Sequence, residues 1–202
     1  MVKKQNFFWA SYADLMTSLF FIMLVLFVLV IAMMKKQQKA TNDQLELIKN
    51  VQNAVKALDE NYFTYQNEYK RFSINRQIQF SSGKSDISIK DKNYLIGVGK
   101  NIETLIDNLK TKYKNQDIKY MIIIEGMASK DNFIYNHELS YQRALALLRL
   151  WQQNGISFDN QICELQVAGS GVAGIGRFKG KEEYKNQRFL IQIIPKIGNI
   201  DN

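Results

Sequence analysis

Apolar side chains dominate one long stretch near the start of the chain, residues 7–34, which contains a single formal charge, Asp14. At about 1.5 Å per residue, a helix of this length would be roughly 42 Å long, enough to cross a bilayer with some tilt. A cleaved signal peptide is the alternative, but its apolar core would be shorter and would end at small residues. This stretch ends at two methionines followed by Lys35 and Lys36. We therefore predict a retained membrane anchor.

Asp14 is the informative residue of this anchor. A carboxylate inside a membrane helix costs about 2.5–3.5 kcal/mol on insertion scales, and such residues usually serve an ion path or a partner. Helical spacing places Ser11, Thr17 and Ser18 on the same face as Asp14. The alternative is that Asp14 lies near enough to the start of the helix to reach water at the lipid headgroups.

A second pattern follows the anchor, with apolar or aromatic residues alternately three and four positions apart from Ile48 to Phe72. This heptad spacing is typical of a helix that pairs with another helix, most simply a second copy of the chain. The alternative is a single amphipathic helix that packs on its own domain. We predict a helical, dimerising stalk over residues 37–75. Its seam residues are Ile48, Val51, Val55, Leu58, Tyr62, Tyr65, Tyr69 and Phe72.

The rest of the chain alternates between strand and helix patterns. Short apolar runs predict strands, and the 3.6-residue period predicts helices. The expected order is βαβαββ, an α+β sandwich with its helices on one face of the sheet. Its elements are strand 77–81, helix 92–113, strand 118–125, helix 137–154 with Asn136 as N-cap, and strands 162–168 and 188–194. The predicted domains are 1–36 (tail and membrane helix), 37–75 (stalk), 76–197 (folded domain) and 198–202 (tail).

Composition removes several classes of function. The net charge of +8 is spread along the chain, so it favours an anionic surface such as headgroups or wall polymer over nucleic acid. With one histidine and one cysteine, Cys163, a His/Cys metal site of the usual ligand number is out of reach. Gly169, Gly171 and Gly174 match GxGxxG, but no amphipathic helix follows them, so we interpret this segment as a loop. We expect no enzyme activity and no cofactor.

Two motifs together resemble a known family. Residues 9–19, WASYADLMTSL, resemble the membrane helix of ion-driven stator B subunits, the MotB group. Residues 135–144, YNHELSYQRA, with Asn-Gln-Arg at 186–188, resemble the OmpA-like peptidoglycan-binding domain. The aromatic start of the anchor is most similar to the stator-like ZorB subunits of Zorya anti-phage defence systems, and the flagellar subunits are the alternative. A passive envelope anchor is a further alternative.

The resemblance implies a place in the cell and a mechanism. It implies a bacterial inner-membrane protein with its N-terminus in the cytoplasm and its folded domain in the periplasm. Two B subunits would sit inside a ring of five A subunits of the ZorA or MotA type. Asp14 would carry the transported ion, for which we expect H⁺ in preference to Na⁺, and Thr17 and Ser18 would help to coordinate it.

The same resemblance implies a wall-binding pocket in the folded domain. The Arg143 guanidinium would grip a carboxylate of the diaminopimelate residue in the wall peptide, for which bidentate geometry is well suited. Tyr135, Asn136 and Leu139 would shape the pocket, and Arg188 would lie nearby. The sequence departs from the family where Gly-His-Thr-Asp is usual, because residues 126–129 read Gly-Met-Ala-Ser. The family's aspartate ligand is therefore absent from its usual place.

Overall fold

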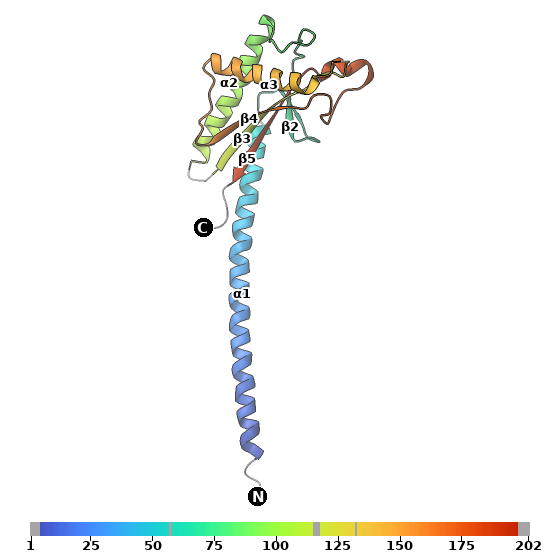
Figure 1. Cartoon of the computed structure of the whole chain (residues 1–202). Coiled ribbons are helices and arrows are strands. Elements are labelled where there is room, and N and C mark those ends of the chain that lie inside the picture. Colours follow the sequence, from blue (N-terminus) through green and yellow to red (C-terminus); the bar gives the residue numbers. More distant parts are fainter. Residues whose placement is uncertain (1–4, 57, 115–117, 132, 198–202) are drawn as a thin grey trace. The chain divides into compact units, whose positions relative to one another are not determined.

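The computed structural model describes residues 5–56, 58–114, 118–131 and 133–197. The chain divides into two compact units, residues 1–47 and 48–202. Helix α1 (Gln5–Lys56) begins in the first unit, and its last turns belong to the second (Figure 1). The α+β class predicted from the sequence is confirmed, with an apolar helix first and a mixed domain after it.

The first unit is a stretch of α1 whose apolar side chains face outward. Residues 9–43 are all exposed, and a window of this helix reaches a mean hydropathy of 3.0 with none of it buried inside the protein. By length and composition this helix can cross a membrane.

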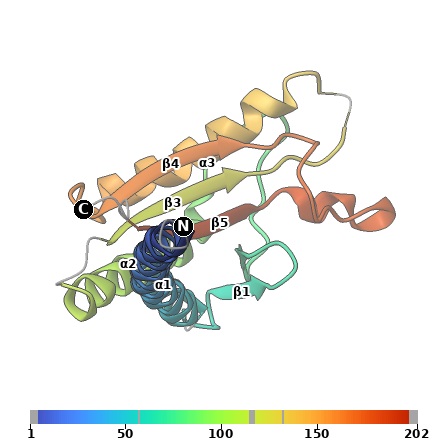
Figure 2. The ribbon, with the colours of Figure 1, turned by 90° about the horizontal axis from the view of Figure 1, so that it is seen from below.

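The second unit contains a five-stranded sheet in the order β1-β2-β5-β3-β4. Strand β3 lies parallel to β4 and antiparallel to β5, while β2 is antiparallel to both β1 and β5. Figure 2 shows β4, β3 and β5 side by side. The strands are β1 (Phe63–Gln66), β2 (Arg71–Ile74), β3 (Ile118–Gly126), β4 (Cys163–Gly169) and β5 (Phe189–Ile197).

Strand β3 forms the centre of the core. Its even-numbered residues Tyr120, Ile122 and Ile124 are fully buried, and the odd-numbered Met121 and Ile123 are half-buried. Because successive side chains of a strand point to opposite faces, the continuous apolar run supplies a side chain to both faces. The predicted strand that ends at Gly126 is therefore confirmed.

Two helices pack together against this sheet. Helix α2 (Ile89–Lys112) and helix α3 (Asn136–Gln153) are joined where the Trp151 indole donates a hydrogen bond of 2.8 Å to the Leu95 carbonyl. Helix α3 contacts β3 and β4. A short 3₁₀ helix, η1 (Gly180–Asn186), precedes β5. Both predicted helices are confirmed, although α3 has Tyr135 and not Asn136 at its N-cap position.

The predicted stalk is wrong after Lys56, where α1 ends. Asp59 forms a turn there: its carboxylate accepts a hydrogen bond of 2.9 Å from the Asn61 amide, and its carbonyl accepts from the amides of Tyr62 and Phe63. The chain then forms the hairpin β1–β2, which joins the sheet through β5. The seam residues Val51, Val55 and Leu58 are buried within their own unit. The alternative, a helix that packs on its own domain, therefore describes this end of α1.

The predicted strand at 77–81 is also wrong. This segment has no strand partner among the described residues, and it is held by side chains instead: Ile78 is fully buried, and the Gln77 amide donates to the Gln187 carbonyl at 2.8 Å. The turn at Ser82 and Gly83 is confirmed, with Gly83 at a φ of 64°. Because β1 and β2 belong to the sheet, the first strands of the domain lie before residue 76.

Candidate functional site

Arg143 lies on the buried side of α3 and is only 3% exposed. Its Nε donates a hydrogen bond of 3.2 Å to the Lys84 carbonyl, and its guanidinium lies over the Phe80 ring at 4.3 Å from the centroid. No hydrogen bond or ion pair joins its two terminal nitrogens to the residues that the structure describes. Burial lowers the pKa of Arg143 to about 10, while the Asp131 carboxylate opposes this shift. The side chain is therefore cationic at neutral pH, with donors left for an anion.

An aspartate lies beside Arg143 after all, but it is Asp131. Its Oδ1 accepts hydrogen bonds from the Asn136 amide at 2.8 Å and from the Phe133 backbone amide at 3.0 Å. Ser129, at the position where the family has its aspartate, instead accepts a hydrogen bond of 2.9 Å from the Gln187 side chain. A carboxylate that acts on the charge of Arg143 therefore comes from the loop before α3.

Asn136 fixes this loop and does not cap the helix. Its Nδ2 also donates to the Phe133 carbonyl at 2.7 Å, so one buried amide holds two points of the loop. Its Oδ1 is buried without a hydrogen-bond partner among the described residues. A buried acceptor of this kind costs about 1–3 kcal/mol unless a donor reaches it, which makes it a further candidate contact for a ligand.

Tyr135 and Leu139 have different surroundings. Tyr135 is 56% exposed, and its ring meets the Phe133 ring edge to face at 5.8 Å between centroids. It therefore lies at the rim of the site, where a ligand can touch it. Leu139 is buried in the core, so its role is to hold α3 in place.

Arg188 does not stand beside Arg143. The Phe189 ring packs edge to face on the Phe80 ring, over which the Arg143 guanidinium lies. Arg188 directly precedes Phe189, and neighbouring residues of an extended chain point to opposite faces. Its Nη2 donates to the Gly176 carbonyl at 2.7 Å, and its guanidinium lies over the Phe178 ring. The structure thus separates the two arginines that the sequence was expected to bring together.

Arg188 belongs to a second buried cluster, which the sequence did not suggest. Arg71 pairs with Glu125 at 3.3 Å and donates to the Ile175 carbonyl at 2.7 Å. Burial lowers the pKa of Arg188, and the positive charges of Arg71 and Arg177 lower it further. The hydrogen bonds from Arg71 to Ile175 and from Arg188 to Gly176 hold the glycine-containing loop 169–177 against the sheet. Arg71 gave no signal in the sequence because its segment was expected to be helical.

The motif residue Asn186 holds Phe178, the residue that directly follows this loop. The Asn186 side-chain amide donates a hydrogen bond of 2.9 Å to the Phe178 carbonyl. The Phe178 backbone amide donates one of 2.9 Å to the Asn186 side-chain oxygen. The Phe178 ring in turn covers Arg188. Asn186 and Arg188 of the Asn-Gln-Arg motif thus both pack against Phe178.

The three residues expected to carry an ion lie on α1 in the first unit. Asp14, Thr17 and Ser18 are all exposed. The Thr17 hydroxyl donates a hydrogen bond of 2.7 Å to the Ala13 carbonyl, so its lone pairs stay available as acceptors. Asp14 makes no hydrogen bond or ion pair with any residue that the structure describes. Within the described ranges, no group of three or more His, Cys, Asp or Glu side chains could hold a metal ion.

Comparisons with known proteins give distant likenesses only. No family model and no curated protein matches the chain. Among solved structures, the periplasmic domain of Helicobacter pylori MotB is 14% identical to this chain, with a TM-score of 0.45. The match covers 69% of this chain and 90% of the MotB chain. The OmpA-like domain of FopA1 from Francisella tularensis is 18% identical over 68% of this chain and 82% of its own, with a TM-score of 0.39. An outer membrane protein from Borrelia burgdorferi is 22% identical over 65% and 95%, with a TM-score of 0.42.

Proposed function

We propose that this protein is a membrane-anchored, wall-binding B subunit of an ion-driven motor, of the stator type. The observation that carries the wall contact is Arg143: a buried cation with unused donors, beside the Asp131 carboxylate. A guanidinium binds a carboxylate through two parallel hydrogen bonds, and a neighbouring carboxylate can accept from an ammonium. The pair therefore suits a zwitterionic amino-acid end such as that of diaminopimelate in peptidoglycan.

The wall contact can be tested by co-sedimentation of the full chain, in detergent micelles, with purified peptidoglycan sacculi. Arg143→Met keeps the side-chain stem but removes the charge, and we expect it to weaken binding roughly ten- to a hundredfold, the loss of a charge-assisted contact of about 1.5–3 kcal/mol. Asp131→Asn should weaken binding as well. The matched control is Lys100→Met, which removes one positive charge from the exposed side of α2. Binding that is unchanged in both site variants would exclude this pocket.

The proposed transported ion is a proton carried by Asp14. Asp14 is the one formal charge in residues 7–34, and an intramembrane carboxylate must be neutralised by a proton, a cation or a partner. Alternation between the neutral and the ionised form changes which neighbours the helix tolerates, which is the property a rotary switch requires. The acceptor oxygens of Thr17 and Ser18 lie on the same helix face.

Ion flux into vesicles that carry the complete complex with the A subunit tests this role. Asp14→Asn keeps size and polarity but cannot ionise, so we expect assembly to persist and proton flux to cease. Asp14→Glu keeps the charge on a longer arm and should retain part of the flux. A passive anchor makes the opposite prediction, because removal of a costly membrane charge would leave output unchanged or improve stability. Equal flux from wild type and Asp14→Asn would refute the motor proposal.

We further propose that the motor serves Zorya anti-phage defence, with two B subunits in a five-membered A ring and the folded domain in the periplasm. This proposal rests on the resemblance of the aromatic anchor sequence to ZorB subunits. The seam of α1 no longer supports the dimer, because Val51, Val55 and Leu58 are buried in their own unit. Phage plating on cells with and without the gene tests defence, and swimming assays test the flagellar alternative.

A further inference from the structure

A small cavity lies between the end of α2 and the beginning of β3. Its volume is about 130 Å³, and at about 30 Å³ each roughly four water molecules occupy the same volume in the liquid. Tyr113, the C-cap residue of α2, and Tyr120 of β3 line it together. The other lining residues are Leu109, Lys110, Lys114, Ile118 and Ile162. The cavity thus combines an aliphatic wall with two phenols and two lysines.

Both phenol hydroxyls are buried without a hydrogen-bond partner in the part of the chain that the structure describes. Tyr120 is only 1% exposed. Burial and, to a lesser extent, the neighbouring Tyr113 raise the pKa of Tyr120 to about 12, so its hydroxyl stays protonated and can donate at neutral pH. A buried hydroxyl that has lost its water and found no partner destabilises the folded chain. Two such hydroxyls in one cavity therefore indicate a ligand that accepts hydrogen bonds.

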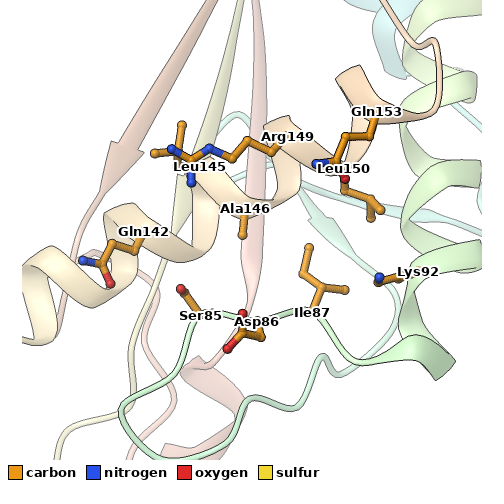
Figure 3. Close-up of a pocket in the computed structure, with 10 residues that line it drawn as sticks. All are labelled: Ser85, Asp86, Ile87, Lys92, Gln142, Leu145, Ala146, Arg149, Leu150 and Gln153. Atoms are coloured by element: carbon orange, nitrogen blue, oxygen red, sulfur yellow. The ribbon is translucent and has the colours of Figure 1, made fainter.

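A larger groove shows why burial matters for this inference. It has a volume of about 610 Å³ and lies between α3 and the segment 85–87 (Figure 3). Its charged side chains, Asp86, Lys92 and Arg149, are exposed, and water satisfies exposed groups without any ligand. The hydroxyls at the end of α2 are buried, so the lack of a partner there is informative.

The charges around the small cavity favour an anion. Lys110 pairs with Asp159 at 2.7 Å, whereas Lys114 is exposed and makes no hydrogen bond or ion pair with a described residue. Lys112 lies over the Tyr113 ring at 5.4 Å from its centroid. The last turn of a helix carries partial negative charge, which these lysines offset. Lys114 then supplies a cation and the two phenols supply donors, a combination that suits a carboxylate.

The aliphatic wall restricts which anion fits. Leu109 and Ile118 are buried, and Ile162 is half-buried. Inorganic phosphate needs polar partners on all sides, and this wall would leave some of its oxygens without them. A carboxylate with a short hydrocarbon tail can place its oxygens at the phenols and its tail against the wall.

We propose that this cavity binds a short-chain carboxylate, whose oxygens accept hydrogen bonds from Tyr113 and Tyr120 and whose charge lies near Lys114. The site is separate from the proposed wall contact, because none of the lining residues belongs to the Arg143 site. The two proposals therefore stand or fall independently.

Ligand-observed NMR titration of the full chain in detergent micelles tests the cavity, with butyrate as the probe and butyramide as its uncharged analogue. We expect the wild type to bind butyrate about tenfold or more tightly than butyramide, because the amide lacks the charge. Tyr120→Phe removes one hydroxyl and keeps the ring, and it should weaken butyrate binding about tenfold. Tyr113→Phe should have a similar effect. The matched control is Tyr184→Phe, which removes the hydroxyl of an exposed tyrosine in η1 and should leave binding unchanged.

Thermal unfolding gives a second measurement. Without ligand, Tyr120→Phe should unfold at the wild-type temperature or above it, because it removes an unsatisfied buried group. Excess butyrate should raise the unfolding temperature of the wild type more than that of the variant. Destabilisation by Tyr120→Phe without ligand would show that the hydroxyl already has a partner and would overturn the proposal. So would equal affinities for butyrate and butyramide, butyrate binding unchanged in both cavity variants, or inorganic phosphate bound as tightly as butyrate.

Discussion

Two glycines allow the start of α3 to lie directly on the sheet. Gly126 of β3 and Gly169 of β4 are paired in register. A Cβ on Gly126 would overlap the backbone oxygen of Ser140, and a Cβ on Gly169 would lie 2.5 Å from the backbone nitrogen of Tyr141. Both obstacles are backbone atoms, so neither can rotate away. The glycines therefore set the height of α3 above the sheet, and with it the position of Arg143.

We expect Gly126→Ala to destabilise the domain by about 1–3 kcal/mol or more, because the added methyl group forces α3 away from β3. Gly97→Ala is the matched control: the three atoms nearest to its Cβ belong to the ring and hydroxyl of Tyr62, a side chain that can move, and alanine favours a helix interior. Urea unfolding, followed by Trp151 fluorescence in a Trp9→Phe background, measures both. If Gly126→Ala unfolds at the wild-type midpoint, this close contact does not position the helix.

The identity of single residues predicted which side chains have free binding groups better than it predicted which side chains lie next to each other. The sequence singled out Arg143, and the structure gives it free donors. It could not show that Asp131, two residues after Ser129, supplies the nearby carboxylate. Nor could it show that Arg188 faces the opposite side of the sheet from Phe189. Such facts depend on which way a loop folds and on strand parity, and neither is encoded in residue type.

Elements with one dominant pattern were predictable. Strand β3 is a continuous apolar run, and α2 and α3 repeat apolar residues at helical spacing, so burial and local propensity agree. The hairpin β1–β2 was missed because its aromatic residues continue the heptad spacing of α1 by coincidence. Tyrosine and phenylalanine favour strands, and the polar segment 59–61 forms the turn that separates them from the helix. The sequence prediction therefore relied on the spacing of apolar residues, although strand propensity and the turn residues both argued against a helix here.

The prediction of a strand at 77–81 was wrong although the composition of the segment favours one. A strand needs a partner edge, and β2 and β3 already occupy both sides of β5. The segment instead passes over the sheet with Ile78 buried and Phe80 packed between Arg143 and Phe189. Its function in the site is thus to supply the ring beneath the guanidinium.

For the whole molecule, the position of the unit boundary decides which fragment can fold. The folded unit begins at residue 48, within α1, and the segment 48–75 supplies part of its core. Arg71 of this segment pairs with the buried Glu125, and β2 covers one edge of β5. The segment also contributes six buried apolar side chains, Val51, Val55, Leu58, Phe63, Phe72 and Ile74.

A chain of residues 48–202 should therefore unfold cooperatively in urea, whereas a chain of residues 76–202 should not fold to a stable native state. Each of the six side chains stabilises by about 1.5–3 kcal/mol when buried, so their loss removes roughly 10 kcal/mol, comparable to the whole stability of a domain. Without Arg71, Glu125 would remain as a buried, unpaired charge, which adds a penalty of about 3–5 kcal/mol. Trp151 fluorescence reports on both fragments, since Trp9 is absent from each. If fragment 76–202 has the same urea midpoint as 48–202, the end of α1 and the hairpin are not needed for the domain to fold. If its midpoint is near zero urea, they are part of the folding unit.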